Sequence, residues 1–199
     1  MGKRMILAKA KTLFCSYGLK SISMDDLAKH AGVSKKTIYQ NYTDKNELVN
    51  NIVQDLAESQ SALFKTCETN AKDAVEEVLM KSDVTLQTWA TVSQPFFVEL
   101  QRSFPAGWKK LLHHKEKVMI PGMIRNLEKG ISEGLYRSEI DIQFMAAVFI
   151  HYHISVIQTN TLTLPGRNAS HVFQEVTHFF LHGICTEKGK KQLNKYLNN

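Results

Sequence analysis

The sequence is poor in the residues that build covalent frameworks. Its three cysteines, Cys15, Cys67 and Cys185, lie far apart, and no two form a C-x-x-C pair. An odd number of widely spaced cysteines is not the pattern of a disulfide framework or of a thiolate zinc site. No nearby pair of basic residues marks any of them as a redox sensor, so we expect reduced thiols packed in the interior.

Long apolar runs are also missing. No stretch approaches the roughly 20 consecutive apolar residues that span a bilayer, and the chain starts with a basic amphipathic segment where a signal peptide would have an apolar core. These absences predict a cytoplasmic protein with no membrane partner. With 43% hydrophobic and 22% charged residues, the chain has enough apolar material for a sizeable core.

Sequence patterns that mark common active sites are absent as well. None of G-x-x-x-x-G-K-S, G-x-S-x-G, H-E-x-x-H or G-x-G-x-x-G occurs. Apolar residues recur along the chain with helical spacing, and no segment has the pattern of a strand. We therefore expect an all-α protein with no catalytic residues. An all-α enzyme remains an alternative, which turnover of a substrate without DNA would reveal.

The most informative segment spans residues 24–42 and reads MDDLAKHAGVSKKTIYQNY. Its apolar residues are spaced as two short helices joined by a tight corner. Gly32 stands at the corner, where glycine adopts a left-handed backbone conformation at little cost. Ser34 is placed to cap the second helix, and Ser23 with Asp26 forms a capping box for the first. The segment is typical of a helix-turn-helix.

The second helix of this motif would expose hydrogen-bond donors on one face once Ile38 turns inward. In a helix-turn-helix the start of that helix enters the major groove and contacts base edges, whereas phenol and ammonium groups beyond it suit phosphate oxygens. Base contact is expected of Lys35, Lys36, Thr37 and Gln40, and phosphate contact of Tyr39, Tyr42 and Lys45. The candidate DNA-binding residues are Ser23, Ser34, Lys35, Lys36, Thr37, Tyr39, Gln40, Tyr42 and Lys45.

The run from Lys9 to Leu48 resembles the DNA-binding domain of the tetracycline-repressor (TetR) family of bacterial regulators. The resemblance is carried by F-x-x-x-G from Phe14, S-M-D-D-L-A from Ser23, A-G-V-S-K-K-T-I-Y from Ala31 and Y-x-x-K-x-E-L from Tyr42. Two positions depart from the family pattern. Lys36 stands where the family often has Gly or Ala, and Asn41 where it often has His, so the base preference is left open.

The resemblance implies an all-α fold with two domains. Residues 1–46 would form a three-helix helix-turn-helix DNA-binding domain, and residues 47–199 a helical ligand-binding and dimerisation domain. The function implied is that of a ligand-responsive transcriptional regulator, usually a repressor, which binds a palindromic operator as a homodimer. Ligand binding would tilt the helix that starts at Lys45 and change the separation of the two recognition helices.

The net charge is confined to the segment that carries the motif. Residues 1–46 contain nine Lys and Arg against three Asp and Glu, whereas residues 47–199 contain sixteen of each. Such a distribution is expected when one domain neutralises DNA phosphates. Two alternatives stay open: a helix pair that never contacts DNA, and a nonspecific architectural DNA binder. The architectural protein would not need the large neutral second domain.

Two segments near the C-terminus predict a homodimer. Residues 141–158 are apolar around nearly the whole helical circumference, and residues 169–185 supply a second apolar face. In proteins that this chain resembles, the last two long helices form a four-helix dimer interface. A dimer would place two recognition helices about 34 Å apart, one turn of DNA. The alternative is a monomeric all-α core.

The resemblance also implies a cavity for an unknown small-molecule effector and no cofactor. Candidate lining residues are Trp89, Phe96, Phe97, Leu100, Phe104, Trp108, Met119, Met123 and Phe144. Methionines and aromatics line permissive apolar sites, so a small apolar or amphipathic ligand is expected, oriented by polar groups such as Glu99 and His113 or His114. The same residues would equally make an ordinary core.

A cluster of histidines near the C-terminus calls for a separate interpretation. His171, Glu175, His178 and His182 fall within about 60° on a helical wheel, and the last two have the i,i+4 spacing of metal ligands. No cysteine or second cluster completes a coordination sphere. We therefore interpret them as a solvated polar face or the rim of the dimer interface, and predict no metal site.

Overall fold

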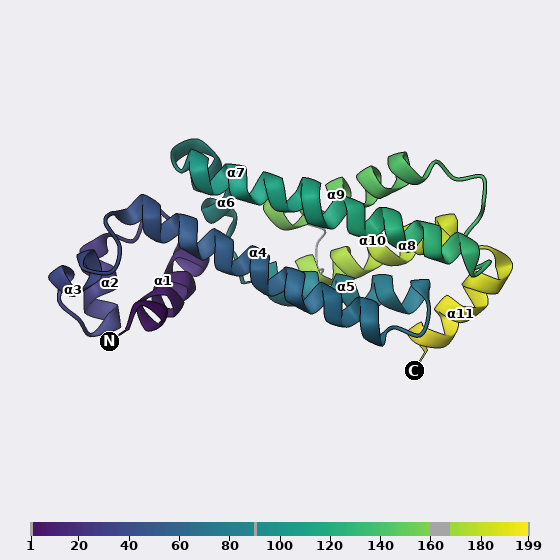
Figure 1. The fold of residues 1–199 in the computed structure, drawn as a ribbon, viewed down its shortest axis with the longest axis horizontal. Helices are drawn as coiled ribbons and strands as arrows, with labels where there is room; N and C mark the ends of the chain where they lie inside the picture. Colours follow the sequence, from purple (N-terminus) through teal and green to yellow (C-terminus); the bar gives the residue numbers. More distant parts are fainter. Residues whose placement is uncertain (1, 90, 160–167, 199) are drawn as a thin grey trace. The chain divides into compact units, whose positions relative to one another are not determined.

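The computed structural model describes residues 2–89, 91–159 and 168–198. Within these ranges the chain is helical, without a strand, as Figure 1 shows, which confirms the expected all-α class. No helix in the described ranges is long and apolar enough to cross a membrane. The elements are α1 (Lys3–Tyr17), α2 (Met24–Ala31), α3 (Lys35–Tyr39), α4 (Lys45–Asn70), α5 (Ala74–Trp89), α6 (Gln94–Ser103), α7 (Pro105–His114), the π-helical turn η1 (Lys115–Met119), α8 (Ile120–Ser132), α9 (Ile142–Thr159), α10 (Ala169–Ile184) and α11 (Glu187–Leu197).

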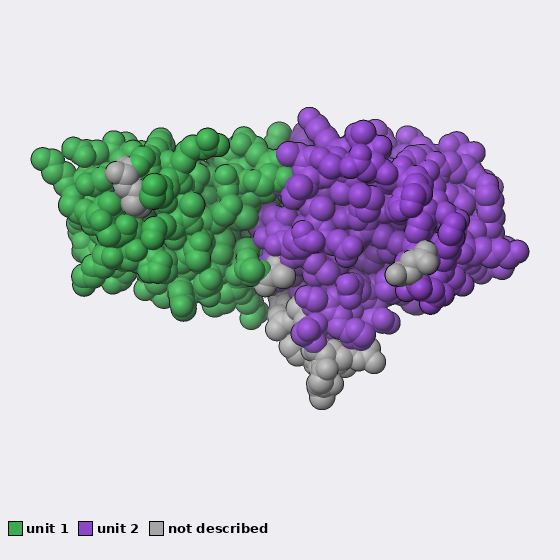
Figure 2. Space-filling model, turned by 90° about the horizontal axis from the view of Figure 1, so that it is seen from below, with its two compact units in different colours: residues 1–59, 91–113 green, residues 60–90, 114–199 purple. Residues whose placement is uncertain are grey.

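The chain forms two compact units, coloured separately in Figure 2. Unit 1 comprises residues 1–59 and 91–113, and unit 2 comprises residues 60–90 and 114–199. Unit 1 therefore contains α1–α3, the first half of α4, α6 and α7. The boundary expected between residues 46 and 47 lies within unit 1 and, as a division by function, stays a prediction.

The core of unit 1 is built from the apolar stripes of its helices. α1 packs against α2 and α6, and α2 packs against α3. Every third or fourth residue of α1 is apolar, so one face of that helix is buried against its neighbours. The fully buried side chains of this unit include Ile6, Ala10, Phe14, Leu27, Ile38, Leu48 and Ile52.

Unit 2 is a helical bundle in which α5 and α9 each contact α8 and α10, and α11 contacts α5 and α10. An aromatic ring packed against α8 explains why residue 130 is a glycine. The ring of Tyr136 lies where a Cβ on Gly130 would be. Any side chain at this residue would displace Tyr136, whose hydroxyl donates to Asn126 Oδ1 at 3.2 Å.

One predicted helix break lies elsewhere in the structure. The sequence predicts a kink or division at Pro121-Gly122, whereas the irregular turn is η1, which precedes Pro121 and ends at Met119. Ile120 N–H donates to Lys115 O across five residues, so α8 begins at Ile120 and Pro121 lies in its first turn. Proline is tolerated there because a first-turn N–H has no partner within the helix.

The three cysteines are free and buried, which confirms packed thiols. Burial raises the pKa of Cys15 and of Cys185 to about 11, and it also raises the pKa of Cys67. Because the thiolate is the reactive form, all three side chains are suited to packing rather than to redox chemistry.

Candidate nucleic-acid interface

The predicted caps of both motif helices are present. Ser23 Oγ accepts the N–H of Asp26 at 3.1 Å, and Asp26 Oδ2 accepts the N–H of Ser23 at 3.0 Å, which completes the capping box. Ser34 Oγ accepts the N–H of Thr37 at 3.1 Å at the start of α3. Gly32 has φ of 71°, in the left-handed region. Side chains that belong to the motif itself therefore fix the corner between α2 and α3.

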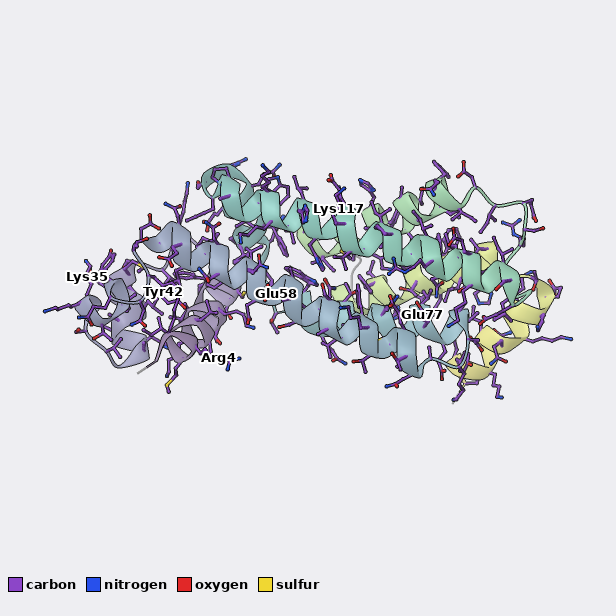
Figure 3. All side chains as sticks on the ribbon, viewed as in Figure 1. Arg4, Lys35, Tyr42, Glu58, Glu77 and Lys117 are labelled. Atoms are coloured by element: carbon purple, nitrogen blue, oxygen red, sulfur yellow. The ribbon has the colours of Figure 1, made fainter. Side chains whose placement is uncertain are left out.

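α3 presents a polar face to solvent. Ile38 is fully buried, while Lys35, Lys36 and Gln40 are exposed and Tyr39 is 43% exposed. Lys35, labelled in Figure 3, lies 2.9 Å from Asp25 Oδ2, and this hydrogen bond raises the pKa of the lysine. Both partners are solvated, so the pair is weak and leaves the ammonium available for DNA.

Tyr42 is part of the domain interior in this structure. This residue, labelled in Figure 3, is 1% exposed, and its hydroxyl donates to Lys3 O at 3.1 Å. The sequence could have indicated this burial, because Tyr42 follows the inward-facing Ile38 by four residues, about one helical turn. In the structure the N–H of Tyr42 donates to Ile38 O at 2.9 Å. The tyrosine holds the start of α1, and its contact with phosphate stays a prediction.

Lys45 is also engaged within unit 1. Its Nζ donates to Ile22 O at 2.5 Å and lies 5.1 Å from the centre of the Phe14 ring. Burial lowers the pKa of this ammonium, although the charges of Glu99 and Asp26 oppose that effect. In the DNA-free protein Lys45 therefore ties the start of α4 to the loop before α2, and its phosphate contact stays a prediction.

Unpaired positive charge remains on the rest of this domain. The salt bridges of Lys3 with Glu47 at 3.5 Å and of Lys11 with Asp55 at 2.6 Å occupy two cations. Several others form no ion pair with any described acidic residue, so they can neutralise phosphates without first breaking an internal pair. These are Arg4, Lys9, Lys20, Lys29 and Lys36.

Glu99 has a role that differs from the ligand contact suggested by the sequence. Its Oε2 accepts the backbone N–H of Leu19 at 2.5 Å and of Lys20 at 2.8 Å, and Ser93 N–H donates to Cys15 O at 2.7 Å. α6 thus holds the loop that leads from α1 into the helix-turn-helix. No sequence signal pointed to this contact, because about 80 residues separate its partners.

The structure brings together only part of the predicted effector site. A cavity of about 250 Å³ lies in unit 2, and among the nine candidates Met119 and Met123 line it. Trp89 is buried in unit 2 but is not part of this lining, and Phe144 is 62% exposed. The remaining candidates belong to unit 1, where Trp108 is partly buried and the others are buried: Phe96, Phe97, Leu100 and Phe104. Apolar composition alone could not assign these residues to one unit or the other.

The two histidines at the end of α7, both predicted as possible ligand contacts, differ in burial. His113 is exposed, whereas His114 is 5% exposed and its Nε2 lies 2.9 Å from Gln60 Oε1. On α10, His171 and His182 are exposed and His178 is partly buried. In the part of the chain that the structure describes, no three His, Cys, Asp or Glu side chains are grouped so that they could hold a metal ion.

The faces of α9 and α10 carry exposed apolar side chains. Phe179 is 82% exposed, Phe144 62% and Tyr152 54%. An open groove of about 490 Å³ lies on these helices, lined in part by Met145 and Val176. An apolar surface of this kind on paired helices is typical of an interaction site.

The polar face of α3 beside a capped glycine corner defines a helix-turn-helix DNA-binding protein. Residues 6–52 match the family described as bacterial regulatory proteins, tetR family. The matched segment runs from α1 into α4 and contains the helix-turn-helix, so this part of the chain is similar to the N-terminal domain of those regulators. No curated protein sequence gives a significant match.

Solved structures share the fold over nearly the whole chain. A TetR-family regulator from Agrobacterium tumefaciens is 19% identical, with 92% of this chain and 97% of that chain covered and a TM-score of 0.78. A putative regulator from Saccharomonospora viridis, solved in complex with choline, is 17% identical, with 93% and 98% covered and a TM-score of 0.77. The fatty acid degradation regulator FadR from Bacillus halodurans is 17% identical, with 91% and 95% covered and a TM-score of 0.72.

Proposed function

We propose that the protein is a homodimeric repressor that binds a palindromic operator and releases it when a small molecule enters unit 2. The observation that carries this proposal is the exposed polar face of α3, which is held by its cap at Ser34 and by the buried Ile38. Lys36 and Gln40 are exposed on that face, and Lys36 forms no ion pair with a described acidic residue, so their donors are available to base edges.

The exposed apolar face of α9 and α10 supports the homodimer. Burying one phenylalanine side chain stabilises an interface by roughly 1.5–3 kcal/mol, and Phe179 is almost completely exposed in the single chain. A two-fold axis would bring the same face of both subunits together and pair the two recognition helices. Half-sites of the operator would then lie about one turn of DNA apart.

The contacts of α4 support a refined path for the effector signal. Lys45, at the start of α4, binds the loop before α2. Asp55, near the end of the part of α4 that belongs to unit 1, pairs with Lys11 of α1. These contacts favour a first half of α4 that moves together with the helix-turn-helix. Effector binding in unit 2 would then reorient this whole block, rather than tilt α4 within it.

Selection from a random pool of DNA duplexes tests the operator. Sequencing of the bound fraction is expected to return one palindrome, with half-sites about one helical turn apart. Equal retention of all sequences would support the architectural alternative and overturn the regulator proposal.

Sedimentation of Phe179→Asp is expected to show a monomer that binds a single half-site weakly, whereas a dimeric variant would contradict the proposed interface.

Substitutions at two positions test how contacts are divided. Lys45→Ala is expected to weaken binding to all sequences alike and to lower the slope of log affinity against log salt by about one unit. Gln40→Ala is expected to relax discrimination at particular base pairs by roughly 1–3 kcal/mol. Anisotropy titrations over a salt series measure both effects, with the exposed Lys117→Ala of unit 2 as control. Altered sequence preference in Lys45→Ala with an unchanged slope would contradict this division.

A further inference from the structure

The cavity of unit 2 has an apolar interior. It is bounded by residues of α4, α5, η1, α8, α9 and α10, and two of its lining residues, Lys65 and Arg125, are exposed. Phe64, Met123, Phe149 and Phe173 are all buried and contribute aromatic or thioether surface to its wall. Because such surface gains little from a polar guest, the part of a ligand that enters this interior is apolar.

Both ring nitrogens of the histidine in the wall already have partners inside the protein. His153 Nδ1 lies 2.7 Å from Phe149 O, and since a carbonyl oxygen only accepts, this nitrogen carries the proton. Nε2 lies 2.8 Å from Thr177 Oγ1, whose one hydroxyl proton is shared among Nε2, Phe173 O at 3.0 Å and Ser82 Oγ at 3.3 Å. Burial lowers the pKa of His153 to about 4, so the ring is neutral at pH 7.

The other inner polar groups are satisfied in the same way. Asn126 donates to Ala74 O at 3.0 Å and accepts from Tyr136 at 3.2 Å. Thr85 donates to Lys81 O at 2.8 Å and accepts from Gln60 at 3.2 Å. A polar ligand group placed beside these atoms would have to compete with hydrogen bonds that already exist inside the protein, and would therefore be poorly compensated for its lost hydration.

Charged side chains at the cavity are predominantly positive. Of the described lining residues, Lys65, Lys81 and Arg125 are cations and Glu68 is an anion. Glu68 and Lys81 are paired with each other at 2.7 Å, and Lys81 also pairs with the buried Glu77 at 2.7 Å. The charges of Lys81 and Glu68 are therefore compensated within the protein and are not available to a ligand.

Lys65 and Arg125 keep free donors. Lys65 is exposed and forms no ion pair with a described residue, while the side chain of Arg125 is 61% exposed and its guanidinium makes one long contact, to Glu68 at 3.5 Å. A guanidinium has five N–H donors, so most of those of Arg125 remain available. The available charge at this cavity is thus positive and matches an anionic group, above all a planar carboxylate.

The backbone of one wall is irregular. η1 is a π-helical turn, and its residue Met119 lines the cavity together with Gly122 of α8. A Cβ added to Gly122 would meet the Arg125 guanidinium at 3.7 Å and nothing closer, so this glycine leaves space beside the free charge. π-helical turns within helices occur frequently at functional sites, and this one shapes the cavity directly.

We propose that this cavity binds a small amphipathic anion, a carboxylate whose apolar part enters the interior and whose head group is held by Arg125 and Lys65. The assignment rests on the proposed effector response and names the chemical class of the effector. A volume of about 250 Å³ corresponds to the space of roughly eight water molecules at about 30 Å³ each. Octanoate, with about ten non-hydrogen atoms, is the matching probe.

Calorimetric titration of the full chain without DNA tests the assignment with three probes of equal chain length: octanoate, 1-octanol and octylammonium. Octanoate is expected to bind at least tenfold more tightly than the other two. Arg125→Gln is expected to reduce octanoate affinity about tenfold and octanol affinity less than twofold, and Lys65→Gln to have a smaller effect of the same kind. The exposed Lys117→Gln serves as control and is expected to leave all three affinities unchanged.

A cavity-filling variant locates the bound chain. Gly122→Met replaces a glycine near the start of α8 with a better helix former, and places a side chain in the cavity. It is expected to retain its thermal unfolding temperature and to lose the binding of both octanoate and octanol. Wild-type octanoate affinity in this variant, or tighter binding of octylammonium than of octanoate, would overturn the assignment.

Operator release is measured separately from ligand binding. Octanoate that binds with the expected variant pattern but leaves the operator complex intact would support the cavity assignment and contradict the effector response of the proposed function. Operator release by another compound, with no binding of octanoate, would support that response and overturn the ligand class assigned here.

Discussion

The two units use buried polar groups in different ways. In unit 1 the side chains bind backbone atoms: Lys45 donates to Ile22 O, and Tyr42 donates to Lys3 O. In unit 2 buried side chains bind backbone atoms and also one another: the buried Glu77 pairs with Lys81, and His153 contacts Thr177. Contacts to backbone fix the course of the chain, which suits a domain that presents α3 in one orientation. Linked side chains around a cavity depend on one another and on its contents.

The difference has an energetic consequence. A hydrogen bond from a side chain to a backbone atom contributes about 1 kcal/mol and acts locally. Removing one member of a buried ion pair costs more, because the partner charge is left without compensation. Substitutions of buried polar residues should therefore be more costly in unit 2 than in unit 1, and the three substitutions below are ordered by that expectation.

The largest effect is expected at Glu77 of α5, which is labelled in Figure 3 and is 4% exposed. It accepts from Lys81 at 2.7 Å and from Lys129 at 3.1 Å. Glu77→Ala would leave two lysines short of a partner and is expected to lower the free energy of unfolding by about 3 kcal/mol. Urea unfolding followed by circular dichroism measures the loss.

Glu128→Ala is the matched control for this substitution. Glu128 is exposed on α8 of the same unit, and its replacement is expected to change the free energy of unfolding by less than about 0.5 kcal/mol. Equal effects of the two substitutions would show that the buried ion pair contributes no more than a surface charge, and the contrast between the units would lose its main support.

The next effect is a pH dependence of stability that originates at His153. The pKa of this ring is about 4 in the folded protein, against an ordinary value of 6.5, because burial disfavours the charged form. The unfolded chain therefore takes up the proton first as the pH falls. The stabilisation is complete above pH 6.5 and is lost between pH 6.5 and 4, to a total of about 3 kcal/mol.

His153→Gln isolates that contribution, since an amide donates and accepts but does not titrate in this range. The variant is expected to lose about 3 kcal/mol less than the wild type when the pH is lowered from 6.5 to 4, as measured by urea unfolding at each pH. His171→Gln on the exposed face of α10 is expected to follow the wild-type curve. Identical curves for all three proteins would exclude His153 as the source.

Much of the helix-turn-helix could be predicted from sequence because its determinants are local. The capping box joins Ser23 to Asp26, the second cap joins Ser34 to Thr37, and Gly32 alone meets the need for a positive φ. All of these interactions span three residues or fewer. The match to residues 6–52 covers the same segment.

The effector cavity could not be predicted in the same way because its determinants lie far apart in the chain. His153 and Thr177 are 24 residues apart, and Asn126 and Ala74 are 52 apart. Helical periodicity tells which face of a helix is buried, but not against which partner it is buried. Aromatic residues such as Phe96 and Phe97 of α6 therefore matched the expected composition of a pocket while belonging to unit 1.

The smallest effect is expected at Tyr42, where the sequence predicts a phosphate contact and the structure shows a contact to backbone. Tyr42→Phe keeps the buried ring and removes the hydrogen bond to Lys3 O, so the free energy of unfolding should fall by about 1 kcal/mol. If the hydroxyl serves only the fold, the affinity of the folded protein for its operator stays within about twofold of wild type, a difference below 0.5 kcal/mol.

Tyr39→Phe completes this comparison, because the ring of Tyr39 is 43% exposed beside the polar face of α3. Loss of the Tyr39 hydroxyl should leave the free energy of unfolding unchanged and weaken binding to all DNA sequences alike. The slope of log affinity against log salt should not change, since a phenol carries no charge. Anisotropy titrations and urea unfolding of both variants separate the two roles. If Tyr42→Phe weakened DNA binding and left the free energy of unfolding intact, the Tyr42 hydroxyl would serve DNA binding directly. The proposed difference between the buried polar contacts of the two units would then be wrong for this residue.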